Sequence, residues 1–481
     1  MKAGRMALRR MMTSAILALA GSSAAWGGGF AGLNERIKFR TYQTVGEPGG
    51  EMREVRTTPF TRHAYVGKPV LDLDDLETSH RFFGLGVSFT DASCWLLSQL
   101  PPERRHALLA ELFTPQGVGL SIGRLNIGAS DYATELYNYN DEPGDVEMKH
   151  FSVARDEVYM IPVLKEAAAI CPDLFYFASP WSPPGWMKTT GEMCGGALKD
   201  DSLEALSNYL LAYLKAYRDR GIRVQALTIQ NEPDTDQHGG CPATIVSGEQ
   251  EAKVTGRLLG PKIAAEGLGT KIWLWDHDVT TTKLARVGRV LEDPAVRKVT
   301  RTVAVHPYTG SATNLQAFVR AHPGVELHMT ECGPNVGSAD GNEVGCLNSV
   351  FSYLENGCSS YLGWNLCLDA DGQPCTGHFH CAGLVEVDIE KGTWKPSGQY
   401  RAFRHIGPFV KRGAEIMRTK PAIFSCTSCV FRNPDGQLVV VLAQKRENRW
   451  RTRVYLKYRG EYLALALPFD RASLTTVVID P

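Results

Sequence analysis

Two glutamates, Glu232 and Glu331, are spaced so that together they could carry out acid–base chemistry. Each follows a short apolar segment, and Glu331 comes 99 residues after Glu232. That interval matches three strand–helix units of about 33 residues, so both side chains would stand at the end of a strand. In a barrel of eight parallel strands, the fourth and seventh strands lie on opposite sides of the mouth. One carboxyl group could then protonate a leaving oxygen while the other acts as nucleophile or base, which is what glycoside hydrolysis requires.

Aromatic and polar residues end the other apolar segments. The flat faces of Trp181 and Trp364 suit the C–H side of a sugar ring, and the amide of Asn231 suits its hydroxyl groups. Reactive groups of a parallel barrel gather at the C-terminal ends of its strands, so we expect these residues around the two glutamates. The remaining candidates of this kind are Arg124, Asp131, His306 and Tyr308.

Short apolar segments alternate with helical patterns from Phe83 onward, and eight such units can be counted. This order predicts an α/β fold, a (β/α)₈ TIM barrel. The competing layout, an open doubly wound sheet, would normally carry a glycine-rich phosphate turn after an early strand, and the sequence has none. The predicted strands are 84–90, 120–127, 174–179, 224–230, 271–275, 302–306, 326–330 and 361–366, and the predicted helices include 102–113, 156–170, 203–220, 248–266, 342–355 and 399–410.

After Gly413 the pattern changes to strands separated by turn signals. This predicts an attached antiparallel, sandwich-like β module, to which the segment Arg36 to Val45 could add a strand. The predicted module strands after the barrel are 422–431, 438–444, 451–458, 462–467 and 475–479. The predicted division is a signal peptide in 1–25, an N-terminal contribution to the β module in 26–80, the catalytic barrel in 81–412 and the C-terminal β module in 413–481.

The charge balance, 52 Lys+Arg against 52 Asp+Glu with 43% hydrophobic residues, argues against a disordered chain and against a nucleic-acid partner. Basic residues before the apolar run Met11 to Ala20 have the order of a secretory signal, and the run is too short for a membrane span. We therefore expect a secreted or periplasmic protein with no stable membrane span in the mature chain. An uncleaved anchor is the alternative.

Export would permit disulfides among the 12 cysteines. Cys426 and Cys429 could form a structural disulfide or remain buried thiols. His277 and His306 have acidic neighbours, but the sequence lacks a spacing typical of metal ligands, so we expect neither a metal nor a cofactor.

The motifs in this order resemble glycoside hydrolase family 30, the family of lysosomal glucosylceramidase. The resemblance runs from about Phe82 to the C-terminus and is carried by residues 83–92, the phrase Ala178 to Thr189, Asn231-Glu232-Pro233, Glu331 and Gly363 to Leu366. It implies a retaining β-glycosidase that acts by double displacement on β-glucosidic bonds, and the N-terminal signal pattern predicts that this enzyme is secreted.

Carried over by position, the resemblance makes Glu232 the general acid/base and Glu331 the nucleophile. It places Asp131, Trp181, Asn231 and Trp364 around the glycone sugar. It also implies that Arg124 lies near the nucleophile and keeps Glu331 ionised while Glu232 stays protonated, that Tyr308 donates a hydrogen bond to Glu331, and that His306 lines the pocket.

One loop departs from the family pattern. Where the glucosylceramidases place a further sugar-binding asparagine, the segment Cys375 to Cys381 brings Phe379 to the site, and His378 or His380 could substitute for the amide. Disulfides at the rim among Cys194, Cys241, Cys375 and Cys381 are a hypothesis.

The substrate is a β-glycoside, either a glycolipid or an oligo- or polysaccharide. An endo-β-1,6-glucanase or a β-xylosidase of the same family is the alternative to a glucosylceramidase-like enzyme. A barrel that only binds carbohydrate is the alternative of another class, although such a protein would not need both carboxylates. A secreted acyl hydrolase would need a Gly-x-Ser-x-Gly elbow, which the chain lacks.

Overall fold

The computed structural model describes residues 37–45, 50–57, 60–61, 70–338, 342–419, 426–445, 453–466 and 471–481. The predicted signal peptide, residues 1–25, lies outside this set and stays a prediction. No helix within the described ranges combines the length and apolar character needed to cross a membrane.

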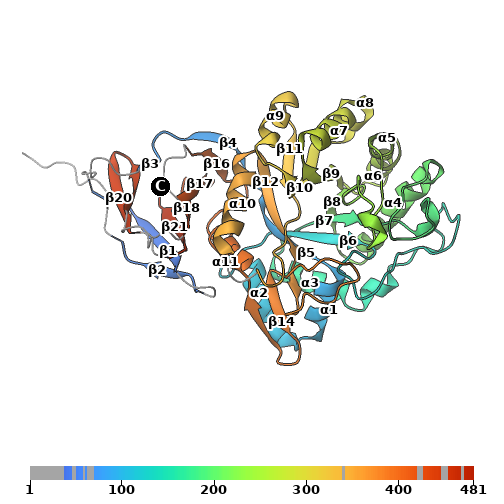
Figure 1. The fold of residues 1–481 in the computed structure, drawn as a ribbon, viewed down its shortest axis with the longest axis horizontal. Helices are drawn as coiled ribbons and strands as arrows, with labels where there is room; N and C mark the ends of the chain where they lie inside the picture. Colours follow the sequence, from blue (N-terminus) through green and yellow to red (C-terminus); the bar gives the residue numbers. More distant parts are fainter. Residues whose placement is uncertain are drawn as a thin grey trace, which may run out of the picture. The chain divides into compact units, whose positions relative to one another are not determined.

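Eight parallel strands close into a barrel in the order β10-β11-β12-β5-β6-β7-β8-β9. Helices surround this barrel (Figure 1). The closed barrel confirms the predicted TIM-barrel fold, and each of the eight predicted strands is present. Their bounds are β5 (Gly84–Phe89), β6 (Ile122–Ile127), β7 (Phe175–Pro180), β8 (Val224–Thr228), β9 (Lys271–Val279), β10 (Thr302–Gly310), β11 (Glu326–Met329) and β12 (Cys358–Asn365).

The helices follow the predicted pattern with one interruption. The predicted helix 248–266 is divided into α5 (Gly248–Lys253), a π-helical stretch (Val254–Leu259) and α6 (Gly260–Ala265). At Gly256 an added Cβ would lie 2.8 Å from the backbone nitrogen of Val296, so α8 approaches the widened turn too closely for a side chain. The other helices are α1 (Asp91–Gln99), α2 (Pro102–Phe113), α3 (Met160–Ile170), α4 (Leu203–Asp219), α7 (Thr281–Glu292), α8 (Pro294–Val299), α9 (Asn314–Ala321), α10 (Glu343–Glu355) and α11 (Gly398–Arg404).

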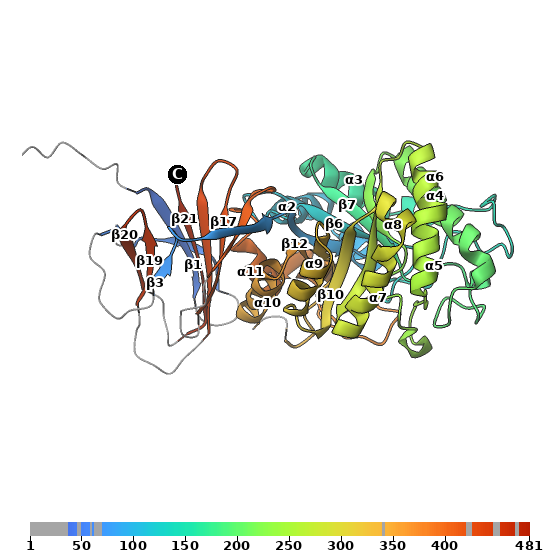
Figure 2. The same ribbon diagram turned by 90° about the horizontal axis from the view of Figure 1, so that it is seen from above.

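Both ends of the described chain contribute to one seven-stranded sheet, in the order β2-β1-β21-β18-β17-β16-β4. The first strand, β1, pairs antiparallel with the last, β21, from Phe39↔Ile479 to Val45↔Ser473, and the two lie side by side in Figure 2. The prediction of a β module joined from both ends of the chain is therefore confirmed. The strands are β1 (Phe39–Val45), β2 (Arg53–Val55), β4 (Glu77–Arg81), β16 (Glu415–Arg418), β17 (Cys426–Arg432), β18 (Leu438–Gln444) and β21 (Ser473–Ile479).

A second sheet of β3 (Val70–Asp72), β19 (Arg453–Tyr458) and β20 (Glu461–Ala466) covers one face of the large sheet. Leu456 and Leu463 from the small sheet share an apolar core with Val430 and Val440 from the large one. The module is not purely antiparallel, because β3 and β19 run parallel.

The opposite face of the large sheet joins the main core of the barrel. Side chains alternate between the two faces of a strand, so Phe431 and Val441 point away from the small sheet that Val430 and Val440 face. Phe431 and Val441 belong to the same apolar cluster as the barrel helices. The buried ring of His405, just after α11, lies between the hydroxyl groups of Thr44 in β1 and Thr476 in β21, at 2.9 Å from each.

Candidate active site

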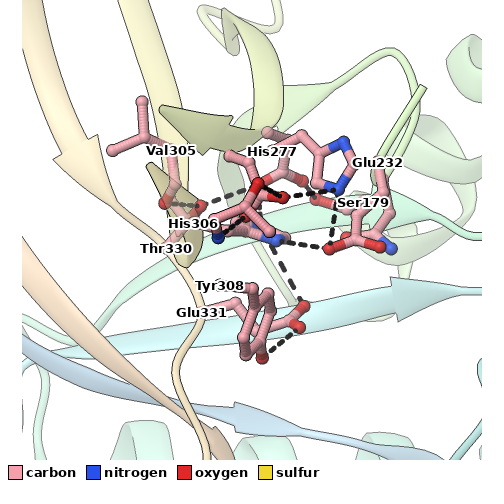
Figure 3. A network of polar contacts seen from close by, with 12 residues as sticks. Ser179, Glu232, His277, Val305, His306, Tyr308, Thr330 and Glu331 are labelled. Carbon is pink, nitrogen blue, oxygen red and sulfur yellow. Dashed lines mark hydrogen bonds and ion pairs between the residues drawn. The ribbon is translucent and has the colours of Figure 1, made fainter. Parts of the chain in front are cut away.

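Glu331 directly follows Thr330 at the end of β11, and its carboxylate is held from two sides. The Tyr308 hydroxyl, from β10, donates a hydrogen bond to Oε1 over 2.8 Å, and Nη1 of Arg124 donates to Oε2. The side chain is almost buried, with 6% of the residue exposed. The predicted contacts of Tyr308 and Arg124 with Glu331 are therefore present, and Figure 3 shows Glu331 beside Tyr308.

Arg124 is fully buried on β6 and joins three parts of the site. Besides Glu331, its Nη2 donates to Asn231 Oδ1 and to Asp276 Oδ2, each over 2.8 Å. Its guanidinium also lies 4.7 Å from the centre of the Trp181 ring. Burial acts to lower the pKa of Arg124, but the charges of Asp276 and Glu331 raise it overall, so the cation is permanent.

Asp276, on β9, is the functional candidate that the sequence analysis missed. Its carboxylate accepts hydrogen bonds from Ser179 and Thr330, both over 2.7 Å, and contacts Arg124 and His306. Burial acts to raise the pKa of Asp276, yet the nearby Arg124 and His306 lower it well below its usual range. The predicted fifth strand ended at Trp275, four residues before the end of β9 at Val279, and so stopped one residue short of this carboxylate.

Glu232 follows β8 in a left-handed backbone conformation with φ 47°. Its Oε1 lies 3.0 Å from His306 Nδ1 and 3.3 Å from His277 Nε2, and its Oε2 accepts a hydrogen bond from Gln237 over 2.8 Å. Both histidines point toward this carboxylate in Figure 3. A carboxylate oxygen of Glu232 and one of Glu331 lie within 4.8 Å of each other, so the predicted pair does meet at the mouth of the barrel.

The pKa of Glu232 lies below its ordinary value in the unliganded protein, whereas the prediction would need it raised. Burial acts to raise the pKa of Glu232, but the hydrogen bond from His306 and the positive charges of His277 and His306 lower it below its ordinary value. The resemblance had implied a carboxyl group that stays protonated. The difference arises because histidines from β9 and β10 both converge on the same oxygen.

His306 carries the positive charge that links both glutamates. Its Nδ1 faces Glu232, its Nε2 lies 3.0 Å from Asp276 Oδ1, and Glu331 Oε2 is 4.0 Å away. Burial acts to lower the pKa of His306, but these carboxylates raise it to about 10. Glu232, His306 and Glu331 lie as close together as metal ligands would. An imidazolium with both nitrogens engaged offers no lone pair to a metal ion, so these three residues do not fit one.

Beside the glutamates lies a cavity of about 490 Å³, which Trp181, Trp364, Asn231 and Asp131 line as predicted. The two indole rings stack on each other with their centres 5.0 Å apart. Asp131 Oδ1 is buried and has no hydrogen-bond partner within the described ranges. Burial and the charge of Glu331 raise the pKa of Asp131. Because its Oδ1 has no partner in the described ranges, this side chain could bind a ligand. The predicted pocket residue His306 lies behind this wall and is not among the lining residues.

The departing loop reaches the cavity through Phe379 and Cys381, whereas His378 and His380 do not line it. Backbone N–H groups of Thr376 and Gly377 donate to the Asp131 carbonyl over 2.7 and 3.1 Å, which fixes the loop against the cavity wall. Neither histidine therefore supplies a polar group to the cavity in place of the expected amide, and the loop presents the ring of Phe379 instead.

The predicted rim disulfides are wrong for this structure, since Cys194, Cys241, Cys375 and Cys381 are all free thiols. Cys426 and Cys429 are also free and buried, which agrees with the thiol alternative. Residues three apart on a strand point to opposite faces, and these two belong to different apolar clusters.

Residues 82–410 match the family model described as the glycosyl hydrolase family 30 TIM-barrel domain. The chain belongs to glycosyl hydrolase family 30. This family-30 chain is therefore a glycoside hydrolase, and the cavity between the two glutamates is its candidate active site.

Relatives within the family carry two kinds of name. An endo-1,6-β-D-glucanase of Neurospora crassa is 32% identical over 371 residues, 72% of this chain and 74% of its own length. A putative glucosylceramidase 1 of Caenorhabditis elegans is 29% identical over 396 residues, 78% of this chain and 76% of its own. A solved endo-β-1,6-glucanase superposes with a TM-score of 0.81 at 26% identity, covering 92% of this chain and 98% of its own.

Proposed function

We propose that this protein hydrolyses β-glucosidic bonds with retention of configuration, using Glu331 as nucleophile and Glu232 as acid/base. The observation that carries the proposal is the separation of the two carboxylates, whose nearest oxygens lie within 4.8 Å. Retaining glycosidases hold their carboxyl groups about 5 Å apart, whereas inverting enzymes need roughly 6.5–9.5 Å to admit a water molecule.

The surroundings of Glu331 suit a nucleophile. Arg124 and Tyr308 both donate to its carboxylate, so its lone pairs are oriented and its charge is balanced before a substrate arrives. As Glu331 attacks the anomeric carbon and the glycosidic bond breaks, Glu232 donates its proton to the leaving oxygen. The resulting Glu232 carboxylate then takes a proton from the water that attacks the intermediate, and Glu331 is released as a carboxylate.

The glycone would lie against the stacked Trp181 and Trp364, with Asp131 and Asn231 at its hydroxyl groups. The unpartnered Asp131 Oδ1 supports this position, because a buried oxygen without a partner is costly until a ligand supplies a donor.

We propose β-1,6-glucan as the preferred substrate. The cavity wall next to Glu232 is formed by Thr235, Gln237, Asp278 and Lys283, which are polar or charged and suit a sugar as the leaving group better than a lipid. The Neurospora crassa relative carries a β-1,6-glucanase name, which supports this choice.

Glucosylceramide is the second candidate. Tyr308 and Phe379 line the same cavity with 47% and 37% of their surfaces exposed, and these rings could contact an apolar aglycone. β-Xylosides are the third class to test.

The test is a panel of β-1,6-glucan, glucosylceramide, xylan and aryl β-glucosides, with the first-formed anomer followed by NMR. We expect turnover of β-1,6-glucan and of the aryl glucoside, β-configured products, and loss of all turnover in Glu331→Gln. An α-configured first product would refute retention. Turnover of none of these glycosides would refute the β-glycosidase assignment.

A further inference from the structure

His277 is a second histidine at the acid/base, and the proposed mechanism does not use it. It lies on β9 and is 5% exposed. One ring nitrogen, Nε2, faces Glu232 Oε1 at 3.3 Å, and the other, Nδ1, lies 2.5 Å from Asp234 Oδ1. Figure 3 shows the ring of His277 next to Glu232. Glu232, His277 and Asp234 thus form a continuous series of polar contacts that leads from the cavity to the Asp234 side chain, which is 30% exposed.

Several charged groups face the ring of His277, and the uncharged ring of Trp275 lies 5.6 Å from it, centre to centre. Asp278 Oδ2 lies 3.6 Å from Nε2, and Lys283, from α7, places its Nζ 3.3 Å from Nδ1 and 3.4 Å from Asp234. The ring of His306 meets His277 edge to face with their centres 6.0 Å apart. Three carboxylates, those of Glu232, Asp234 and Asp278, therefore face His277 against the two cations Lys283 and His306.

Asp234 determines which nitrogen of His277 can exchange a proton. Because the Asp234 carboxylate accepts from Nδ1–H, the neutral ring carries its hydrogen there and turns a lone pair at Nε2 toward Glu232. The Nε2 atom then either accepts a hydrogen bond from a protonated Glu232 or holds the proton itself and donates to the ionised carboxylate.

We propose that His277, oriented by Asp234, is a positioning residue that shares one proton with Glu232 and so sets the pH up to which Glu232 can act as an acid. This inference rests on the proposed retaining mechanism. In one state the proton is on Glu232 Oε1 and His277 is neutral. In the other the O–H bond has broken, an N–H bond has formed at Nε2, and both groups are charged, with no change in total charge.

His306 cannot share a proton with Glu232 in this way. Its Nε2 is occupied by Asp276, and the surrounding carboxylates raise the pKa of His306 to about 10, so it keeps its proton while Glu232 titrates. Of the two histidines on Glu232, only His277 has a nitrogen whose proton state can change with that of the acid.

The experiment is the pH profile of kcat/KM for two substrates of the full-length protein. An alkyl β-glucoside needs a proton from Glu232 for departure of the leaving group, whereas a 2,4-dinitrophenyl β-glucoside does not. The wild-type pair loses its shared proton at a pH that both sites set together, so in His277→Gln, where the second site is missing, Glu232 loses its proton at lower pH. We expect the alkaline limb for the alkyl glucoside to move down by about one pH unit, with little change for the dinitrophenyl substrate.

Asp234→Asn keeps a hydrogen-bond acceptor but removes the charge that favours the imidazolium, so a smaller shift in the same direction is expected. The matched control is Glu326→Gln, which removes a half-exposed carboxylate 3.4 Å from the buried His328 at the opposite end of the barrel. This control should reproduce the wild-type profile with both substrates.

An unmoved alkaline limb in His277→Gln, or an equal loss with both substrates, would overturn the inference, since a merely structural role predicts the equal loss. These outcomes differ from failure of the proposed function, in which the wild-type protein itself would not turn over the dinitrophenyl glucoside.

Discussion

The two ends of the barrel interior differ in chemistry although the same strands build both. Near the start of the strands an apolar layer fills the barrel, including Ile122, Phe177, Ala226, Ala304 and Leu362. Two residues later on the same strands, where side chains point inward again, stand Arg124, Ser179, Thr228, His306 and Trp364. The change from an apolar to a mainly polar interior therefore takes one inward step along each of these five strands.

This difference shows how the fold separates stability from chemistry. The apolar layer needs only complementary shapes, whereas every charge at the mouth needs partners, because a buried ion without them is strongly unfavourable. Arg124, His306 and Asp276 satisfy one another there, and this fixed set positions Glu331 and Glu232. Substitutions at the mouth should consequently lower kcat/KM, whereas substitutions in the apolar layer should lower the free energy of unfolding.

After the loss of all turnover expected in Glu331→Gln, the next largest effect is also at the mouth, in Glu232→Gln. Loss of the general acid should lower kcat/KM for an alkyl β-glucoside by about 10²–10⁴-fold. A dinitrophenyl glucoside, with its good leaving group, should lose far less in glycosylation. The thermal midpoint should stay near that of the wild type, which calorimetry can measure.

Azide provides the control for that variant. In Glu232→Gly, a residue that accepts the φ of 47° at this position, azide should restore turnover of the activated substrate and give a glycosyl azide product. An alkyl-glucoside activity equal to the wild type's would contradict the acid/base role of Glu232.

The apolar end should respond in the opposite way. Phe177 is fully buried and its ring centre lies 4.9 Å from that of Trp273. Phe177→Ala should lower the free energy of unfolding by about 3–5 kcal/mol, measured by denaturant titration. The kcat of the folded fraction should stay within about twofold of the wild type, because the contacts of Glu232 and Glu331 do not involve this ring. A large fall in kcat without loss of stability would contradict the separation of stability from chemistry between the two ends of the barrel.

The sequence was sufficient to predict the barrel, because hydrophobic periodicity and strand order are local signals. The change of pattern after Gly413 also predicted the β module, to which residues 36–45 could add a strand, but it did not predict that this strand pairs with β21. The lowered pKa of Glu232 could not be predicted in this way, since its contacts His277, His306 and Gln237 come from three separate segments.

Backbone geometry set a second limit on prediction. Trp275 and Asp276 have φ values of 78° and 67°, which side chains of these types rarely adopt. This left-handed turn occurs where the predicted fifth strand stopped, so a strand pattern alone did not extend to Asp276. That Cys426 and Cys429 remain separate thiols, in contrast, follows from strand periodicity, because residues three apart on β17 point to opposite faces.

Two buried histidines extend the comparison to the pH dependence of stability, with smaller effects. The pKa of His306 at the mouth is raised to about 10, whereas burial and Arg404 lower the pKa of His405 beneath the β module to about 3. The Thr476 hydroxyl donates to the His405 carbonyl and so accepts from Nδ1–H, while Nε2 accepts from Thr44; both contacts fit a neutral ring.

The two histidines should therefore act with opposite signs, each by at most about 1.4 kcal/mol per pH unit. A raised pKa means that His306 contributes its full stabilisation below about pH 6.5, the unfolded value, and loses it as the pH rises toward 10. A lowered pKa means that the unfolded chain takes up the His405 proton first, so this site destabilises the fold as the pH falls from about 6.5 toward 3.

Urea titrations across pH 4–10 of the wild type, His306→Gln and His405→Gln measure these contributions. The free energy of unfolding of His306→Gln should approach that of the wild type at alkaline pH, and that of His405→Gln should approach it at acid pH. Parallel curves for both variants would mean that neither ring changes its proton affinity on folding.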